Sequence, residues 1–297
     1  MLYDSMIPFL AKTEERGKTS GISGALSFLG TFAAVALGMV AWKIWGEYSK
    51  PEKVYNGDAS LDYGGLVPLF GITVAAIVLF ALPFLFSREK ENPNQNGFHQ
   101  NLRDSIATFK NTLQEIFHYK NALIFILGWF FITDASNTAV LYMQLVIVDG
   151  AGATPNQALM IIALGGLLSM IGAIVVGLLL DKFGPKLNFI INIFAWIISV
   201  SITVLACIEV NGQHIIPWQS MFLTAFFIGI GFGGIWLIGR QFVFEIAPPD
   251  KVAQYSGFKS IAGRVSAILS PLTFLIIFYS VRNTGISVSN SYAIALS

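Results

Sequence analysis

Long apolar runs alternate with short polar segments along this chain. Five runs contain no Asp, Glu, Lys or Arg: 19–42, 63–87, 150–180, 187–208 and 210–239. Each exceeds the roughly 18 residues that a helix needs to cross a hydrocarbon core of about 30 Å. The runs are continuous and lack the period-2 alternation of membrane strands. The pattern therefore predicts an all-α integral membrane protein.

Two further apolar segments are interrupted by charge. The segment 121–148 contains Asp134, and the segment 257–281 contains Lys259 and Arg264. With these two, about seven complete transmembrane helices are expected, at about 21–44, 64–87, 121–148, 156–180, 187–208, 217–239 and 257–281.

Composition and the placement of the basic residues extend this interpretation. The chain is 55% hydrophobic and 12% charged, about half the charged share of a soluble domain. Its sparse basic residues form no surface for nucleic acid. If the spans alternate in direction, the segments 12–20, 88–120, 181–186 and 240–264 lie on the same side of the membrane. These four segments contain fourteen of the 18 Lys and Arg residues. Because basic loops stay in the cytoplasm, loops 88–120 and 181–186 are predicted to be cytoplasmic.

The segment 88–120 is the one long polar stretch, and it separates two predicted spans from five. Within it, apolar residues recur at helical spacing: Leu102, Ile106, Phe109, Leu113, Ile116 and Phe117. Such a stripe is typical of a connector helix on the membrane surface. A helix that binds a partner protein is the alternative.

A spaced motif lies in the predicted turn between the spans 156–180 and 187–208. Its fixed positions are Gly177, Leu179, Asp181, Lys182, Gly184 and Lys186. The spacing resembles the G-x-L-x-D-[RK]-x-G-x-[RK] signature of the major facilitator superfamily. Small residues there let helices approach closely, and Asp181 can pair with a cation or with the positive N-terminus of a neighbouring helix.

Other short motifs resemble one branch of that superfamily, the vacuolar amino-acid effluxers associated with autophagy and their prokaryotic relatives. They are the segments 3–8 and 14–21, Asp134-x-x-Asn137-Thr138, Gly239-Arg240, the segment 247–249, and Ser256-Gly257 through Gly263-Arg264. The resemblance implies a partial major-facilitator-type helical bundle that matches family spans 5 to 11. Residues 1–87 would end the N-terminal half-bundle, 88–120 would be a cytoplasmic linker with an amphipathic helix, and 121–297 would form the C-terminal half-bundle. Family spans 1 to 3, most of 4 and nearly all of 12 would then be absent, and a sibling chain that supplies them is one alternative.

Asp134 is the sharpest candidate for solute binding. An ionised carboxylate near the bilayer centre costs about 3 kcal/mol, so it needs a partner, water or a proton. Asn137, Thr138 and Tyr142 follow at helical spacings of three, four and eight residues. One interpretation is that this face lines the central cavity and that Asp134 binds a substrate amine or a coupling proton. The other is that Asp134 only tethers a neighbouring helix.

The basic and acidic residues at the predicted cytoplasmic ends are candidates for a gate. The resemblance implies that Asp181 contacts the N-terminus of the span after Arg16. Arg240 with Glu245 or Asp181 could close the cytoplasmic side, whereas the alternative for Arg240 is an ordinary interfacial charge. Lys182, Gly184 and Lys186 complete the motif.

No constellation of reactive residues points to an enzyme, a cofactor or a metal site. The glycines at 229, 231, 233 and 234 lie inside an uncharged span, so helix packing is favoured over a dinucleotide-binding loop. The segment 21–24 matches the GxSG of rhomboid proteases, but no histidine lies on a membrane helix to activate its serine.

We therefore expect a secondary active transporter that moves a small polar solute by alternating access. Amino-acid efflux coupled to protons through Asp134 is the finer expectation, with lipid and the solute as partners. The alternative is a truncated or regulatory membrane protein that does not transport and needs a partner chain. The membrane would be the plasma membrane in a prokaryote and a vacuolar or lysosomal membrane in a eukaryote.

Overall fold

A computed structural model describes most of the 297-residue chain. The described residues are 15–45, 119–248 and 251–297, with isolated positions between 71 and 82 and at 114. The chain divides into two compact units, one of Met1–Phe28 with Leu102–Ser297 and the other of Leu29–Asn101. The contacts described below lie within the first unit.

The first described helix, α2 (Arg16–Trp45), contains the predicted span 21–44. Of the predicted span 64–87, positions 71, 74, 75, 77–79 and 82 are described, and all are helical. The remainder of that span lies outside the described residues. The same holds for the predicted surface helix in 88–120, of which only 114, 119 and 120 are described.

Helix α5 (Lys120–Leu145) and the π-helical turn η5 (Val146–Gly150) form the predicted span 121–148. Helix α6 (Pro155–Cys207) follows, and its N-terminus is fixed by a capping box and a proline. The Thr154 side chain accepts from the Gln157 N–H while the Gln157 side chain accepts from the Thr154 N–H, and Pro155 occupies the first helical turn. This reciprocal cap satisfies two amides that would otherwise lack partners.

The 53 residues of α6 form two membrane crossings rather than one long rod. The helix is broken at Gly184, whose φ of 72° and ψ of 171° are not helical. In a straight helix Leu168 and Trp196 would lie about 42 Å apart. Yet Leu168 packs at Gly229 of the next helix and Trp196 packs at Gly231, two residues further on. The two arms of α6 therefore fold back on each other, as the predicted spans 156–180 and 187–208 require.

The turn between the arms is held by a side chain of the second arm. The Asn188 Nδ2 donates to the carbonyl oxygens of Leu179 at 3.1 Å and Gly184 at 2.7 Å. Asn188 is buried, so its amide finds acceptors on both sides of the break and ties the two arms together.

A two-stranded hairpin, β1 (Glu209–Val210) and β2 (Gln213–His214), joins α6 to the next helix, with Asn211 and Gly212 at positive φ in its turn. The 3-10 turn η6 (Trp218–Ser220) then leads into α7 (Met221–Ile246), and together they cover all of the predicted span 217–239 except its first residue. Helix α8 (Val252–Arg282) covers 257–281, and the short α9 (Val288–Leu296) ends the described chain.

Four segments of the described part are long and apolar enough to cross a membrane: Lys120–Gly150, Pro155–Cys207, Trp218–Ile246 and Val252–Arg282. Because the second is folded at Gly184, these segments contain all five spans that were predicted after residue 120. Large apolar side chains such as Phe131 and Ile276 are about two-thirds exposed. Such exposure fits a surface that faces lipid.

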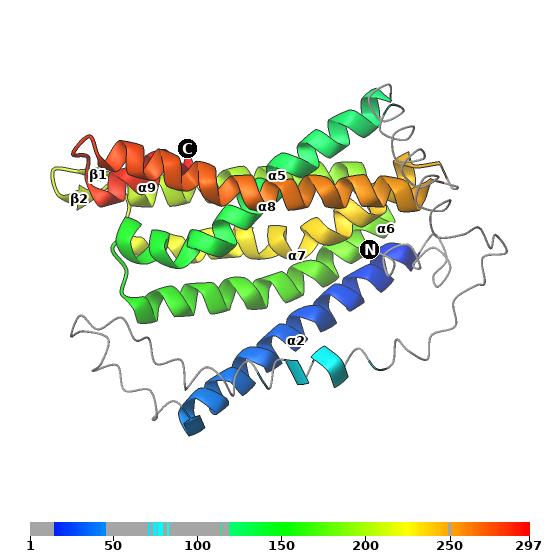
Figure 1. Ribbon diagram of the computed structural model, residues 1–297, viewed down its shortest axis with the longest axis horizontal. Helices are drawn as coiled ribbons and strands as arrows, with labels where there is room; N and C mark the ends of the chain where they lie inside the picture. Colours follow the sequence, from blue (N-terminus) through cyan, green and yellow to red (C-terminus); the bar gives the residue numbers. More distant parts are fainter. Residues whose placement is uncertain are drawn as a thin grey trace, which may run out of the picture. The chain divides into compact units, whose positions relative to one another are not determined.

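Helix α6 packs most extensively against α7, and α5 packs against α8 (Figure 1). Glycines make the first contact close. A Cβ added at Gly172 would lie 2.7 Å from the Ile230 Cα, and one added at Gly234 would lie 2.8 Å from a Val176 methyl carbon. The glycine series of α7 therefore serves helix packing, as predicted.

Candidate functional site

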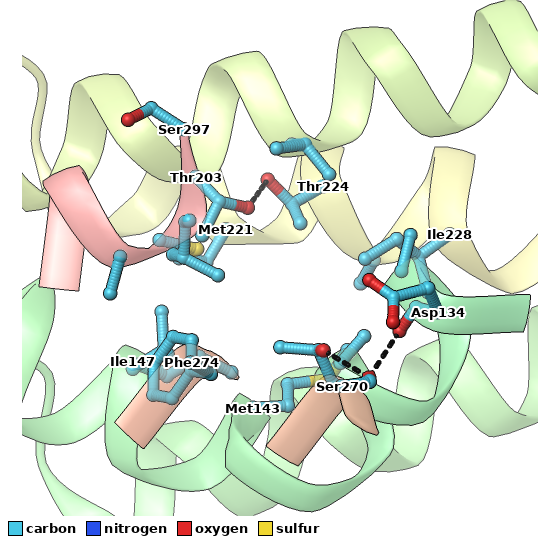
Figure 2. Close-up of a pocket in the computed structure, with 18 of the residues that line it drawn as sticks. Asp134, Met143, Ile147, Thr203, Met221, Thr224, Ile228, Ser270, Phe274 and Ser297 are labelled. Atoms are coloured by element: carbon cyan, nitrogen blue, oxygen red, sulfur yellow. Dashed lines mark hydrogen bonds between the residues drawn. The ribbon is translucent and has the colours of Figure 1, made fainter. Parts of the chain in front are cut away.

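A cavity of about 340 Å³ lies among the helices of the first unit. Its wall is formed by α5 with η5, both arms of α6, α7, α8 and the end of α9 (Figure 2). Most of the wall is apolar. The polar side chains in it are those of Asp134, Thr138, Thr203, Thr224, Ser270, Thr273 and Ser297.

Asp134 lies on α5, half-buried at one end of this cavity (Figure 2). The helix around it is fastened to α8 by Ser270. The Ser270 Oγ donates to the Asp134 backbone carbonyl at 2.8 Å, and the Thr138 and Ser270 hydroxyl oxygens are 2.7 Å apart. These bonds hold the α5 backbone in place and leave the Asp134 carboxylate at the cavity wall.

A second polar contact lies across the cavity, between α6 and α7. The Thr203 Oγ1 donates to the Ser199 carbonyl at 2.9 Å and lies 3.4 Å from the Thr224 Oγ1. The Ser199 Oγ in turn donates to the Thr224 carbonyl at 3.1 Å. All three residues are buried, so the bonds join the second arm of α6 to α7.

The four residues predicted to share a binding face are divided by the structure. Asp134 and Thr138 line the cavity, but Asn137 and Tyr142 are not among its lining residues. The Asn137 Nδ2 lies 3.5 Å from the Ser266 Oγ. Tyr142 is buried and stacks on the Phe274 ring at a centroid distance of 4.3 Å.

The Tyr142 hydroxyl also donates to the Pro271 carbonyl at 3.1 Å. Asn137 and Tyr142 thus pack α5 against α8 in this conformation, and binding of a solute by them stays a prediction. Asp134 and Thr138 are the members of the stripe that a solute in this cavity could reach.

Asp181 makes the contact that the family resemblance implies. Its Oδ1 accepts the Gly17 N–H at 2.6 Å, and its Oδ2 accepts the Lys18 N–H at 2.7 Å. Both amides belong to the first turn of α2, which begins at Arg16. A carboxylate there satisfies free N–H groups and opposes the positive end of the helix dipole. We call this contact the Asp181 clasp.

Small residues bring the two helices of the clasp together. A Cβ added at Gly177 would lie 2.8 Å from the Gly21 Cα, and one added at Gly17 would lie 2.6 Å from the Asp181 Oδ1. The clasp therefore needs glycine at these positions as well as the carboxylate.

The other motif and gate residues lie near the same ends of the helices. Lys182 and Lys186 are exposed on either side of Gly184, and Arg16 is half-buried. Arg240 is half-buried near the end of α7, and Glu245 is exposed five residues later. A gate formed by Arg240 and Glu245 stays a prediction.

Sequence reasoning missed two features of this region. It did not identify Ser270, although Ser266 and Ser270 at a spacing of four residues mark one polar face of α8. It also counted Lys259 only as one of the basic residues on the predicted cytoplasmic side. Lys259 is in fact buried, with its Nζ 4.9 Å from the centre of the Trp129 ring. The ring accounts for this burial in part, because a cation is attracted to an aromatic face.

Comparisons with known proteins agree with this architecture. The family model for the Major Facilitator Superfamily matches residues 2–271. An uncharacterized protein of Aquifex aeolicus is 21% identical over 267 residues, which is 90% of this chain and 58% of the relative. The multidrug resistance protein MdtG of Salmonella arizonae is 26% identical over 213 residues, which is 70% of this chain and 46% of the relative.

The uncharacterized MFS-type transporter YxiO of Bacillus subtilis is 21% identical over 203 residues, which is 68% of this chain and 45% of the relative. The chain thus spans about half the length of the curated relatives it matches. The branch of vacuolar amino-acid effluxers does not appear among these relatives. With its apolar helices and a family match over most of its length, this multi-pass integral membrane protein belongs to the major facilitator superfamily.

Proposed function

We propose that the chain takes part in alternating-access transport of a small molecule, which binds in the cavity beside Asp134. The observation that carries the proposal is the Asp134 carboxylate at the wall of an apolar cavity within membrane helices. A charged side chain among membrane helices has a high free-energy cost, so an acidic residue there is taken to be functional by default. The family supplies the class of activity, secondary transport rather than an enzymatic reaction.

The Asp181 clasp is the second part of the proposal. It joins the turn between the two α6 arms to the first turn of α2 through two short hydrogen bonds. Asp181 is exposed, so water can replace these bonds when the helices separate. The clasp would therefore hold one side of the transporter closed and open as the bundle rocks. Arg240 and Glu245 would add to the same gate.

A more specific form of the proposal is efflux of amino acids, and the cavity supports binding of only one of their two charged groups. Asp134 can bind the amine of an amino acid. The described residues that line the cavity, however, include no Lys, Arg or His for the carboxylate of the same molecule. Support for amino acids therefore comes from the resemblance alone, whereas a relative named as a multidrug resistance protein favours a broader set of substrates. Coupling to protons through Asp134 belongs to the same proposal.

The lengths of the relatives favour a second candidate. Because this chain matches between 45% and 58% of them, it could act as a subunit that pairs with a sibling chain. Affinity purification from the native membrane distinguishes the two candidates. A second multi-pass protein recovered in equal amounts would favour the subunit. All three relatives come from bacteria, which favours the plasma membrane as its location.

Transport by the reconstituted protein tests the main proposal. Proteoliposomes would be screened for uptake of amino acids and of drug-like amines, with and without a pH gradient. Asp134→Asn should reduce uptake of the transported compound at least tenfold. Asp149→Asn is the matched control, because Asp149 is exposed at the end of η5 and does not line the cavity. Equal uptake by both variants and the unaltered protein would reject Asp134 as the binding residue.

A further inference from the structure

We infer that the cavity selects an organic monocation with an apolar body, with Asp134 as the residue that selects the charge. This inference rests on the proposed function, because it names the class of molecule that would bind at the same site. It follows from three properties of the wall: its charge, the direction of its hydrogen bonds and the placement of its apolar side chains.

The charge of the wall is negative. Asp134 is the one charged side chain among the described residues that line the cavity. An anion or a zwitterion would leave its own negative group without a cation in a poorly solvated site, which is unfavourable. A cation beside Asp134 instead supplies the partner that a carboxylate among membrane helices requires.

The hydroxyl groups of the wall reinforce this preference. Helices α5 to α8 contribute five Ser and Thr hydroxyls to the wall, and four of them donate their hydrogen to another protein atom. The Ser270 Oγ donates to the Asp134 carbonyl, so the hydrogen between Thr138 and Ser270 comes from Thr138. The Thr273 Oγ1 donates within α8 to Leu269 at 3.1 Å, or to Ser270 at 3.0 Å.

Thr203 donates to the Ser199 carbonyl at 2.9 Å in the same way, which leaves Thr224 as the fifth hydroxyl. A hydroxyl has a single hydrogen to donate. The wall therefore offers many acceptors and few donors. That balance suits an ammonium group and disfavours a carboxylate, a phosphate or a sulfate.

Large apolar side chains line the end of the cavity that is remote from Asp134, and Ile228 lies beside Asp134 itself. Figure 2 shows Met221, Ile147 and Phe274 across the cavity from the Asp134 carboxylate. Asp134 and Ile147 are both on the α5–η5 segment, 13 residues apart, which corresponds to about 20 Å along a helix. The Asp134 carboxylate thus lies at one end of the cavity, and a group of large apolar side chains lies at the other, next to the hydroxyls of Thr203 and Ser297 (Figure 2).

Methionine side chains let the apolar part of the wall adapt to ligands of different shapes. Met143 and Met221 both line the cavity, and unbranched thioethers adapt to irregular partners. The volume of about 340 Å³ is at the lower end of the range of about 300–1,000 Å³ for small-molecule sites. The occupant is therefore a compact amphiphilic cation rather than a large drug.

Equilibrium binding to the full chain in lipid nanodiscs tests the inference. The probe is radiolabelled phenyltrimethylammonium, and its competitors are tert-butylbenzene, a neutral molecule of the same shape, and phenylalanine. We expect saturable binding that weakens at least tenfold in Asp134→Asn and is retained in Asp149→Asn. Neither competitor should displace the probe at matched concentration. Thermal unfolding of each variant verifies that Asp134→Asn is folded.

The outcomes separate the inference from the proposed function. If tert-butylbenzene displaces the probe as well as unlabelled probe does, or if Asp134→Asn binds it normally, selection by charge is wrong. If phenylalanine binds in an Asp134-dependent manner and the cation does not, the class of molecule is wrong and the proposed site stands. If transport in proteoliposomes does not depend on Asp134, the proposed function itself fails, whatever the binding result.

Discussion

The two carboxylate oxygens of Asp181 accept hydrogen bonds from consecutive backbone amides, those of Gly17 at 2.6 Å and Lys18 at 2.7 Å. Asp181 and Gly17 are 164 residues apart in the sequence. The clasp therefore joins distant segments through one side chain, and it can be tested separately from the cavity.

Removal of the Asp181 carboxylate should open this side of the protein. Ser20 lies one turn into α2 and is fully buried, so a cysteine at this position reports separation of the helices. In a Ser20→Cys background, Asp181→Ala should increase the rate of maleimide labelling several-fold, because the two hydrogen bonds to α2 are lost. The native Cys207 is buried and should contribute little labelling. Lys182→Ala is the control, and an equal increase there would assign the effect to the loop rather than to the clasp.

Gly17→Ala should disrupt the same contact by overpacking. The added Cβ would meet the Gly177 carbonyl oxygen and come within 2.6 Å of the Asp181 Oδ1. Insertion of one methyl group into a tight contact costs about 1–3 kcal/mol. Unfolding in micelles with increasing SDS measures this loss. Gly257→Ala is a matched control in α8, because no heavy atom lies within 4 Å of the added Cβ there. Equal stability of the two variants would contradict the close approach.

Thr203→Val should weaken the contact between the second arm of α6 and α7. The substitution keeps the shape of the side chain but removes the bonds to Ser199 and Thr224. A hydrogen bond contributes about 0.5–1.5 kcal/mol to stability. Thr273→Val is the comparison, since both hydroxyl bonds of Thr273 stay within α8. Thr203→Val should unfold with a free energy roughly 1 kcal/mol lower than that of Thr273→Val. A smaller loss of stability in Thr203→Val than in Thr273→Val would argue against the interhelical bond.

Gly184→Ala should destabilise the turn of α6 through the backbone alone. The added Cβ would meet no heavy atom within 4 Å, so crowding is not involved. A φ of 72° with a ψ of 171° is accessible essentially to glycine, and other residues pay about 1–3 kcal/mol there. The same SDS unfolding assay measures the loss. An unchanged midpoint would mean that the turn can adopt another conformation.

The membrane helices could be predicted from the sequence because the thickness of the hydrocarbon core sets the length of each apolar run. A helix must be apolar for about 20 residues to cross, and charged residues end each run. The double crossing of α6 was visible for the same reason, since Asp181, Lys182 and Lys186 interrupt an otherwise apolar stretch. Gly184 in this interruption marked the turn itself.

The orientation of side chains around a membrane helix was harder to predict. In lipid, apolar residues occupy the packed face and the exposed face alike, so hydrophobic periodicity does not distinguish the two. At 3.6 residues per turn, Asn137 and Tyr142 lie about 140° apart around α5. The cavity is itself lined from opposite sides of α5, since Asp134 and Met143 are about 180° apart, so position around the helix alone does not decide which residues line it. Of the four predicted residues, Asp134 and Thr138 line the cavity, while Asn137 and Tyr142 bond to α8 away from it.

The burial of Lys259 could not be read from the sequence either. A lysine near the end of an apolar run normally extends toward the membrane surface. Here Trp129 of α5 lies beneath the lysine Nζ, and the glycine at 239 makes room for the indole ring. That arrangement involves residues from three helices, and a single sequence does not disclose such contacts.

The hairpin of α6 also bears on how the protein enters its membrane. Its two arms are tied by Asn188 across a turn that carries Asp181, Lys182 and Lys186. Insertion of the pair with the opposite orientation would carry these three charges through the hydrocarbon, at about 3 kcal/mol for each. The arms can therefore insert together as one unit whose charged turn stays on the side of synthesis. The turn whose Asp181 clasps α2 in the folded protein would then also fix the topology during biogenesis.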